Sequence, residues 1–362
     1  MERPLLVYTH PKRFFFVAKD IELLRPHFRV IEHSFNSRSS LLLPWDFFRQ
    51  FLALVIARMR GARIAIVHFA GHHAVLPVLL GFRTYIIVAG SDSCSFPKIG
   101  YGSFRKKWMG RSMAYSMRNA AAILPVHKSL ERFQNSYSDS GSYEQGYAHF
   151  IPGTLPPSIP IAYGFDIDRW KSTVAVRNND RILCIANGAA RGNAIHFRKG
   201  IDLLEQAAVR SPHLHFTVVG TDTGSYKDAP ANLTFLPVVP PDRLSKLFND
   251  HGIYVQPSIM EGFPNALCEA MLSGCIPIGS NMTSIPHIIG GAGKIIAQRN
   301  ATLLLEAIEE IRALSEEQVT ELRLLARQQV IGYTLGERSR RLLEILRQPR
   351  SPEPADRLAD DR

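Results

Sequence analysis

Residues 253–279 read IYVQPSIMEGFPNALCEAMLSGCIPIG, and this stretch decides the fold class. An apolar run at 253–256 predicts a strand, and a second one at 276–279 predicts another. Between them a helix is expected over 265–273, because Pro264 suits the first turn of a helix. A strand, a helix and a strand in this order favour parallel pairing with a right-handed crossover. The stretch therefore predicts an open α/β sheet.

The same alternation fills the rest of the chain, in two blocks that meet near residue 170. In the first block, strands are expected at residues 5–8, 29–32, 63–69, 84–89, 121–126 and 159–163, with helices at 14–25, 45–60, 74–81, 104–118 and 128–137. In the second block, the other expected strands are 181–186, 215–220 and 233–237, and the other helices are 200–208, 244–249, 303–313, 316–331 and 337–347. We therefore predict two Rossmann-like domains that face a cleft.

The domain boundaries follow from this alternation. The first domain is expected to span residues 1–168 and the second residues 169–335. A C-terminal helix at 336–348 would be free to pack back on the first domain, and the polar, proline-containing end at 349–362 is expected to form a flexible tail.

Composition excludes several classes of protein. The chain has 362 residues, of which 46% are hydrophobic, and no run of 18 apolar residues predicts a membrane-spanning helix. Residues 1–10 lack the pattern of a signal peptide. The cysteines are scattered without the spacing of metal ligands: Cys94, Cys184, Cys268 and Cys275. Reduced thiols of this kind indicate a cytoplasmic protein without a metal.

Positive charge is concentrated in the first half of the chain. The formal net charge is +11, and residues 1–170 carry 21 basic and 11 acidic side chains. Residues 171–362 are nearly balanced, with 22 basic and 21 acidic side chains. Such an excess is typical of a solvated basic surface, but it also suits a membrane, a lipid-linked substrate or nucleic acid. We do not expect nucleic acid, because no recognition-helix or RNA-binding motif is present.

Two carboxylates border the predicted turn and helix. Glu261 lies in the turn after a strand and Glu269 lies one turn into the helix, so both can border one ligand. Open α/β sheets bind ligands at this end of their strands. The first amides of the helix favour an anionic diphosphate, and the carboxylates accept hydrogen bonds from the hydroxyls of a sugar or a ribose.

The segment Glu261-Gly-Phe-Pro-Asn265-Ala-Leu-Cys-Glu269 resembles the Glu-x7-Glu signature of retaining glycosyltransferases of family 4, which have the GT-B fold. The resemblance implies that Glu261 contacts the donor sugar and Glu269 the nucleotide ribose, whereas solvated surface glutamates are the alternative. It also implies that the backbone of this loop and of one earlier glycine borders the donor: Gly262, Phe263, Pro264, Asn265, Ala266, Leu267 and Gly188. The amides of residues 263–267 would face the donor phosphates.

A second match begins the first long helix of the second domain. Arg198-Lys199-Gly200 resembles the family's Arg-Lys-Gly segment, which implies that Lys199 neutralises the donor diphosphate. In the preceding loop, Arg191 is the candidate for a second cation. Two cations replace a divalent metal in this role, and the chain lacks an Asp-x-Asp metal motif, so no cofactor or metal is expected. The alternative is that Lys199 is only a surface charge at the start of a helix.

The first domain resembles the family more loosely. Ala89-Gly90-Ser91-Asp92 resembles a Gly-Ser-Asp segment near the acceptor, which makes Asp92 a candidate to orient or deprotonate the acceptor hydroxyl. An aspartate that caps a turn would give the same pattern. The chain also departs from the family, because His10-Pro-Lys12 stands where a glycine-rich loop is usual and His287 stands where glutamate is common.

Two further features have competing interpretations. His68, His72 and His73 could mimic a metal site, but without carboxylate or cysteine support they favour core and loop histidines, with acceptor contact open to the last two. The segments 45–60 and 103–111 combine aromatic and basic residues, as surfaces that bind an anionic membrane do. A helix that covers a sheet would look much the same as the first of these segments.

Together these features predict a retaining glycosyltransferase. Its substrates would be a nucleoside-diphosphate sugar and a glycan or lipid-linked acceptor, in the synthesis of cell-envelope polysaccharide or glycolipid. A cytoplasmic site, peripheral to the inner face of the membrane, would suit such an acceptor. The alternatives are a catalytically silent sugar-nucleotide-binding module at a membrane and a GT-B sugar-nucleotide epimerase. Closure of the two domains would exclude water from the donor.

Overall fold

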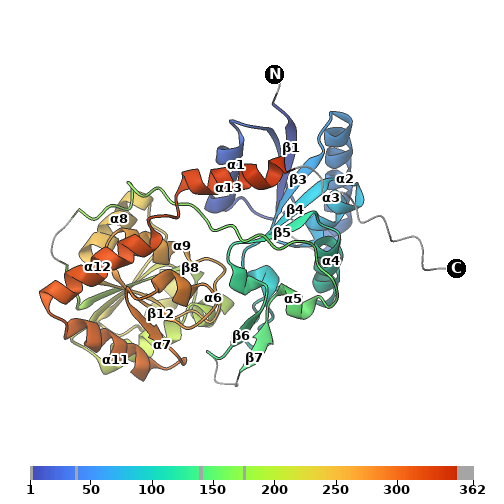
Figure 1. Ribbon diagram of the computed structural model, residues 1–362. Coiled ribbons are helices and arrows are strands. Elements are labelled where there is room, and N and C mark those ends of the chain that lie inside the picture. Colours follow the sequence, from blue (N-terminus) through green and yellow to red (C-terminus); the bar gives the residue numbers. More distant parts are fainter. Residues whose placement is uncertain (1–2, 37–39, 138–141, 174–176, 349–362) are drawn as a thin grey trace.

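The computed structural model describes residues 3–36, 40–137, 142–173 and 177–348, and these form two α/β domains (Figure 1). The first sheet is parallel, with the order β2-β1-β3-β4-β5. Its strands are β1 (Leu5–His10), β2 (Arg29–Ser34), β3 (Ile64–His68), β4 (Arg83–Val88) and β5 (Ala122–Pro125). The second sheet is also parallel, with the order β10-β9-β8-β11-β12-β13. Its strands are β8 (Arg181–Ala189), β9 (His215–Thr221), β10 (Leu233–Leu236), β11 (Ile253–Gln256), β12 (Ile276–Ser280) and β13 (Lys294–Ile296). The predicted fold class is confirmed.

Helices alternate with these strands along the chain. Around the first sheet lie α1 (Phe15–Leu24), α2 (Leu43–Met59), α3 (Val75–Leu79), α4 (Lys107–Arg118) and α5 (Tyr147–Phe150). The second sheet is accompanied by α6 (Ala194–Arg198), α7 (Ile201–Arg210), α8 (Pro241–Asp250), α9 (Asn265–Leu272), α10 (Ile285–Ile289), α11 (Ala301–Arg312) and α12 (Glu316–Val330). In the first domain α1 covers one face of the sheet, and α2, α3 and α4 cover the other (Figure 1). No helix in the described part of the chain is long and apolar enough to span a bilayer.

Two predicted elements of the first block are wrong. Residues 159–163 form no strand, although the amides of Ile159 and Ile161 donate to the carbonyls of Ile123 and Pro125 in β5. The helix predicted at 128–137 is replaced by a single turn and by β6 (Phe133–Asn135). The partner of β6 is β7 (Tyr143–Gln145), and this antiparallel pairing outweighs the local helical pattern.

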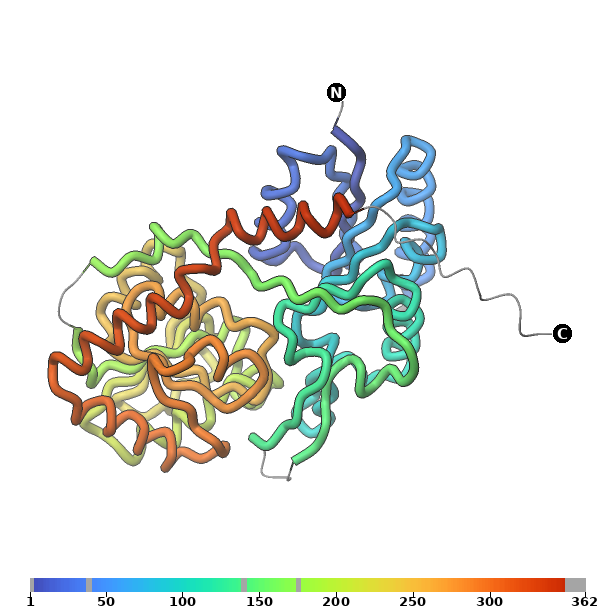
Figure 2. Tube along the Cα trace, viewed as in Figure 1, coloured from blue at the N-terminus to red at the C-terminus, as the bar shows by residue number. Residues whose placement is uncertain are grey.

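Two segments far apart in sequence cross between the domains side by side (Figure 2). The chain leaves the first domain after α5, and α13 (Leu335–Arg347) returns to pack on α1. The amide of Phe165 donates to the carbonyl of Tyr333 at 2.8 Å, which joins the two crossings. Arg338 of α13 is buried: its guanidinium pairs with Asp20 of α1 at 2.7 Å and donates to the carbonyl of Ala162, also at 2.7 Å. The tail predicted at 349–362 lies outside the described residues.

The domains also meet backbone to backbone. Gly262, in the loop between β11 and α9, lies against the turn after β4, and a Cβ atom there would stand 1.9 Å from the carbonyl oxygen of Ala89. On the opposite side of the contact, Gly90 has a φ of +132°, and a Cβ atom on it would lie 3.1 Å from the amide nitrogen of Gly262. Only residues without a side chain permit this approach. The Glu261 loop is thereby fixed against the first domain.

Candidate active site

The loop that carries Glu261 is held by the junction between α6 and α7. Gly200 has a φ of +71°, and a Cβ atom there would lie 2.5 Å from the carbonyl oxygen of Pro257, so this close approach requires glycine. The amide of Ile259 donates to the carbonyl of Arg198 at 2.8 Å. The guanidinium of Arg198 in turn donates to the carbonyl of Met260 at 3.1 Å. These contacts bring the Arg-Lys-Gly segment directly beside the carboxylate.

The carboxylate of Glu261 has two cationic neighbours. Its Oε1 lies 2.7 Å from the Nζ of Lys199 and 3.1 Å from the guanidinium of Arg198. Burial alone would raise the pKa of Glu261, but the charges of Lys199 and Arg198 lower it more, so the pKa lies below its ordinary value. Glu261 is therefore a carboxylate at neutral pH and accepts hydrogen bonds.

Arg198 has a place in the site to which the sequence pattern assigned no role. Its guanidinium lies 4.8 Å from the ring centroid of Tyr101, a residue of the first domain. Burial would lower the pKa of Arg198, but Glu261 and Tyr101 raise it, so the side chain stays charged. In the sequence, its position next to Lys199 was the only signal that pointed to Arg198. Contact with both domains makes Arg198 a second cation of the site.

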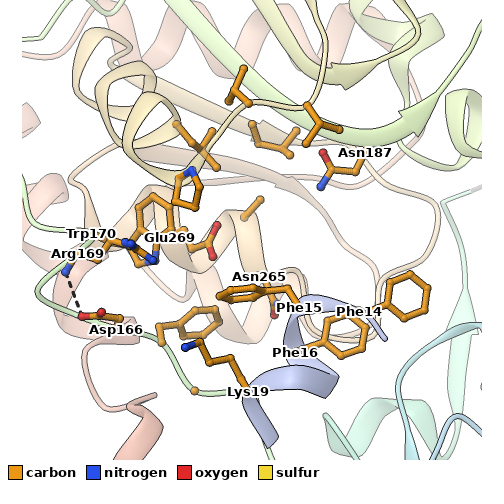
Figure 3. A pocket seen from close by; sticks show the side chains of 18 of the residues that line it. Phe14, Phe15, Phe16, Lys19, Asp166, Arg169, Trp170, Asn187, Asn265 and Glu269 are labelled. Atoms are coloured by element: carbon orange, nitrogen blue, oxygen red, sulfur yellow. Dashed lines mark hydrogen bonds between the residues drawn. The ribbon is translucent and has the colours of Figure 1, made fainter. Parts of the chain in front are cut away.

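Glu269 borders a separate cavity of about 430 Å³ between the domains (Figure 3). Glu269, Asn265 and Ala266 reach it from α9, and Phe15 and Lys19 reach it from α1. The remaining lining residues are Phe14, Phe16, Gly164, Phe165, Asp166, Arg169, Trp170, Ile185, Asn187, Val219, Val238, Val239, Pro241, Leu244 and Leu335. A volume of this order is typical of pockets for small ligands.

Two polar groups of α9 in this cavity are suited to a ligand. Burial raises the pKa of Glu269 to about 8, and the charge of Arg169 opposes this shift only in part. At neutral pH the carboxyl is therefore mostly protonated, and it can both donate and accept a hydrogen bond. The Oδ1 atom of Asn265 is buried and accepts no hydrogen bond from any residue that the structure describes. Ligand hydroxyls or amides would satisfy both groups.

Of the other predicted donor-binding residues, some lie away from the cavity and two begin α9. Phe263 does not line the cavity: its ring packs 5.2 Å from that of Tyr333, and Leu267 is buried in the core. Pro264 has no amide proton, and the amide of Leu267 donates to the carbonyl of Pro264 at 3.0 Å. Asn265 and Ala266 therefore begin α9 with the amides available to an anion.

The structure does not bring Arg191 to Glu261. Its guanidinium lies 2.8 Å from Glu205 and 3.3 Å from Asp228, and it stacks over the ring of Tyr226. These two carboxylates pair with Arg191 instead, and Arg198 is the second cation beside Glu261. Gly188 is exposed near the end of β8, with a φ of +82°. Its neighbour Asn187, rather than Gly188, lines the cavity.

Asp92 holds the turn that touches Gly262. Its carboxylate accepts hydrogen bonds from the amides of Ala70 at 2.9 Å, Ala89 at 3.0 Å and Gly90 at 2.9 Å. Burial raises its pKa to about 6, although these amides oppose the shift. Both carboxyl oxygens are thus engaged within the first domain. The contacts favour the turn-capping interpretation over deprotonation of an acceptor.

The three clustered histidines have separate partners. His68 lies between the hydroxyls of Tyr8 and Tyr163, at 2.9 Å from each. His73 is hydrogen-bonded to the backbone carbonyl of His68, and His72 to the hydroxyl of Ser112 of α4. Within the described ranges, no three His, Cys, Asp or Glu side chains are grouped as metal ligands.

Comparison with known proteins finds a family to which the second domain is similar. Residues 181–313 match the family model of the glycosyl transferases group 1. A 97-residue segment is 31% identical to the serotype-specific mannosyltransferase WbdA of Escherichia coli. That segment is 27% of this chain and spans only 11% of the mannosyltransferase.

Solved structures resemble the whole chain. Sucrose-phosphate synthase from Thermosynechococcus elongatus has a TM-score of 0.73 and 14% identity, over 96% of this chain and 99% of the synthase. HepE from Anabaena, solved with UDP and glucose, has a TM-score of 0.69 and 12% identity, over 96% of this chain and all (100%) of that protein. The pneumococcal O-GlcNAc transferase GtfA, solved with UDP and GlcNAc, has a TM-score of 0.58 and 15% identity, over 82% of this chain and 60% of that chain. These likenesses establish the GT-B fold.

The protein is therefore one with the GT-B fold whose second domain matches the group 1 glycosyl transferase model. The second domain is therefore similar to the group 1 glycosyl transferases, in line with the resemblance of the Glu-x7-Glu and Arg-Lys-Gly segments to that family.

Proposed function

We propose that this protein transfers a glycosyl group from a nucleoside-diphosphate sugar to a glycan or lipid-linked acceptor, with retention at the anomeric carbon. In this reaction the bond between the anomeric carbon and the diphosphate oxygen breaks. The acceptor oxygen bonds to that carbon on the same face, and its proton passes to the departing diphosphate. The protein contributes by orienting the sugar and stabilising the negative charge that develops on the leaving group.

The contact between Lys199 and Glu261 is the observation that carries this proposal. A donor sugar would offer hydroxyls to Glu261, and its diphosphate would attract the Nζ of Lys199 away from a carboxylate 2.7 Å distant. Arg198 would remain with Glu261, because it is held by the carbonyl of Met260 and stacks on Tyr101. The binding of the diphosphate would therefore replace one ion pair without leaving Glu261 unpaired.

The cavity beside Glu269 is proposed to hold the nucleoside. A neutral carboxyl at this position would exchange hydrogen bonds with the ribose hydroxyls, and Asn265 would supply a further acceptor. The amides that begin α9 lie between this cavity and the Glu261 loop, where the diphosphate would pass. The uridine nucleotides in HepE and GtfA support a nucleotide donor as the class of substrate.

The acceptor is proposed to be an envelope glycan or glycolipid, on the likeness to a serotype-specific mannosyltransferase. That likeness also makes mannose nucleotides the first donors to test.

Donor binding and turnover test the proposal separately. Thermal shifts with UDP-, GDP-, ADP- and TDP-sugars should identify one base that raises the melting temperature. Release of radiolabelled sugar from that donor should then be lost in Glu261→Ala and unchanged in Glu205→Ala, whose carboxylate pairs with Arg191 away from the site. Binding without turnover in the wild-type protein would leave only a sugar-nucleotide-binding module. No response to any donor would contradict the proposal altogether.

A further inference from the structure

Helix α2 has apolar side chains on two opposite sides. Leu54 and Ala57 are buried on the side that faces the rest of the domain. On the other side, five large apolar residues recur at spacings of three and four residues, which places them in one stripe. They are 44% to 83% exposed: Trp45, Phe48, Leu52, Ile56 and Met59. Packing on the sheet therefore explains only the first stripe, and the sheet-covering interpretation of this segment is incomplete.

The second predicted basic and aromatic segment lies beside the first. Trp108, near the start of α4, is 71% exposed and lies under the guanidinium of Arg111, at 4.9 Å. Phe47 of α2 packs edge-on against His72, which is hydrogen-bonded to Ser112 of α4. Helix α3, with an exposed Leu79, contacts both α2 and α4 on the same side of the sheet (Figure 1). We call the surface formed by Trp45, Phe48, Leu52, Ile56, Met59, Leu79 and Trp108 the α2–α4 face.

The segments that form the α2–α4 face are rich in positive charge. Residues 40–63 and 97–119, which contain α2 and α4, hold ten basic side chains and one acidic side chain, Asp46. Arg49 is exposed on α2, Arg111 is exposed beside Trp108, and Lys107 is exposed at the start of α4. A second copy of the chain would set these cations against one another, because a two-fold interface pairs a surface with itself. Anionic lipid headgroups complement both the apolar and the charged groups.

We propose that the α2–α4 face docks on the surface of a bilayer that contains anionic lipids. The Trp and Phe rings would lie at headgroup level, and the arginine and lysine side chains would reach the lipid phosphates. The proposal goes beyond the proposed function, but its consequence for the acceptor rests on that function. Helices α2 and α4 begin after the carboxyl ends of β2 and β4, on the side where the turn held by Asp92 meets Gly262. Docking would bring a lipid-linked acceptor to that side.

Vesicle flotation tests the docking without any need for catalysis. Wild-type protein should float with vesicles of phosphatidylcholine mixed with phosphatidylglycerol, and much less with phosphatidylcholine alone. Phe48→Ser/Leu52→Ser/Ile56→Ser should abolish flotation. Arg49→Gln/Lys107→Gln/Arg111→Gln should weaken it by about a hundredfold, at roughly fivefold for each cation removed. Salt should weaken binding of the wild type in the same direction.

A matched control is available in the second domain. Val209 and Leu324 are exposed to a comparable degree, at 69% and 59%, so Val209→Ser/Leu324→Ser should float like the wild type. Circular dichroism and melting temperature would confirm that each variant is folded. Equal flotation of the apolar variant and the wild type would overturn the proposal. So would a wild-type dimer, in sedimentation velocity, that the same three serines convert to a monomer.

Discussion

Glu261 and Glu269 are eight residues apart, the first in the loop before α9 and the second within α9. Their electrostatic surroundings nevertheless shift their pKa values in opposite directions. Glu261 lies beside two cations, and its pKa is below the ordinary value. Glu269 has only the distant charge of Arg169 to oppose burial, and its pKa rises to about 8. The difference shows that burial alone does not set the charge of a carboxyl group; the neighbouring cations decide it.

This contrast divides the site by chemistry. The Glu261 region is ionic and lies where the two domains touch through Gly90 and Gly262. The Glu269 region is an interdomain cavity lined mainly by apolar and aromatic side chains. A charged diphosphate suits the first region, and a nucleoside suits the second.

Removal of the Lys199 charge should have the largest effect. Lys199→Met is expected to lower donor turnover by about 100- to 1000-fold, because the developing charge on the diphosphate loses its nearest cation. Steady-state kinetics with radiolabelled donor would measure it. Lys227→Met, at an exposed lysine of the same domain, should leave turnover unchanged. Similar rates for both variants would remove Lys199 from the proposed chemistry.

Neutralising each carboxyl group in turn tests the contrast through stability. Glu261→Gln leaves Lys199 and Arg198 without their anionic partner and should cost about 3 kcal/mol in the free energy of unfolding. Glu269→Gln should cost nothing at neutral pH and should instead stabilise, because the folded protein holds that carboxyl mostly protonated whereas the unfolded chain ionises it. Guanidinium denaturation of both variants gives the comparison. Equal losses would mean that the two carboxyl groups share one environment.

The pH dependence sharpens the same contrast. The pKa of Glu269 is higher in the folded protein, about 8, than its ordinary 4.5, so its contribution to stability is full below pH 4.5 and is lost as the pH rises through 8. The wild type should therefore become less stable than Glu269→Gln by about 2 kcal/mol across this window, a reduced figure because Glu269 keeps some exposure to solvent. Calorimetry of both proteins at several pH values would measure the difference. Parallel stability curves would contradict the raised pKa.

The smallest effect is expected at Arg191. Its ion pairs with Glu205 and Asp228 are partly exposed, so Arg191→Gln should change stability by less than about 1 kcal/mol and leave turnover intact. Arg198→Gln provides the contrast, because it removes a buried partner of Glu261. Turnover assays of the two variants decide which arginine belongs to the site. A larger loss in Arg191→Gln would restore the assignment made from sequence.

The second domain was more predictable than the first. The strands and long helices predicted for it were correct to within a few residues, because each is a local apolar pattern between clear turn signals, although the short β13 was not predicted. In the first domain, β6 was missed because its formation depends on antiparallel pairing with β7, the next strand along the chain. The extended crossing at 159–163 resembles a strand in composition and donates two hydrogen bonds to β5, yet it runs on between the domains and forms no strand.

By itself, the sequence determined the two parallel α/β domains, the resemblance of the second domain to a family, and Glu261, Glu269 and Lys199 as candidate site residues, because these depend on local periodicity and on short motifs. The tertiary structure alone decided that Arg198 lies beside Glu261, that Arg191 faces other carboxylates, and that Asp92 holds a turn. It also decided the opposite pKa shifts of Glu261 and Glu269. The physical reason is that charge and burial depend on which distant segments fold together, and no spacing along the chain encodes those distances.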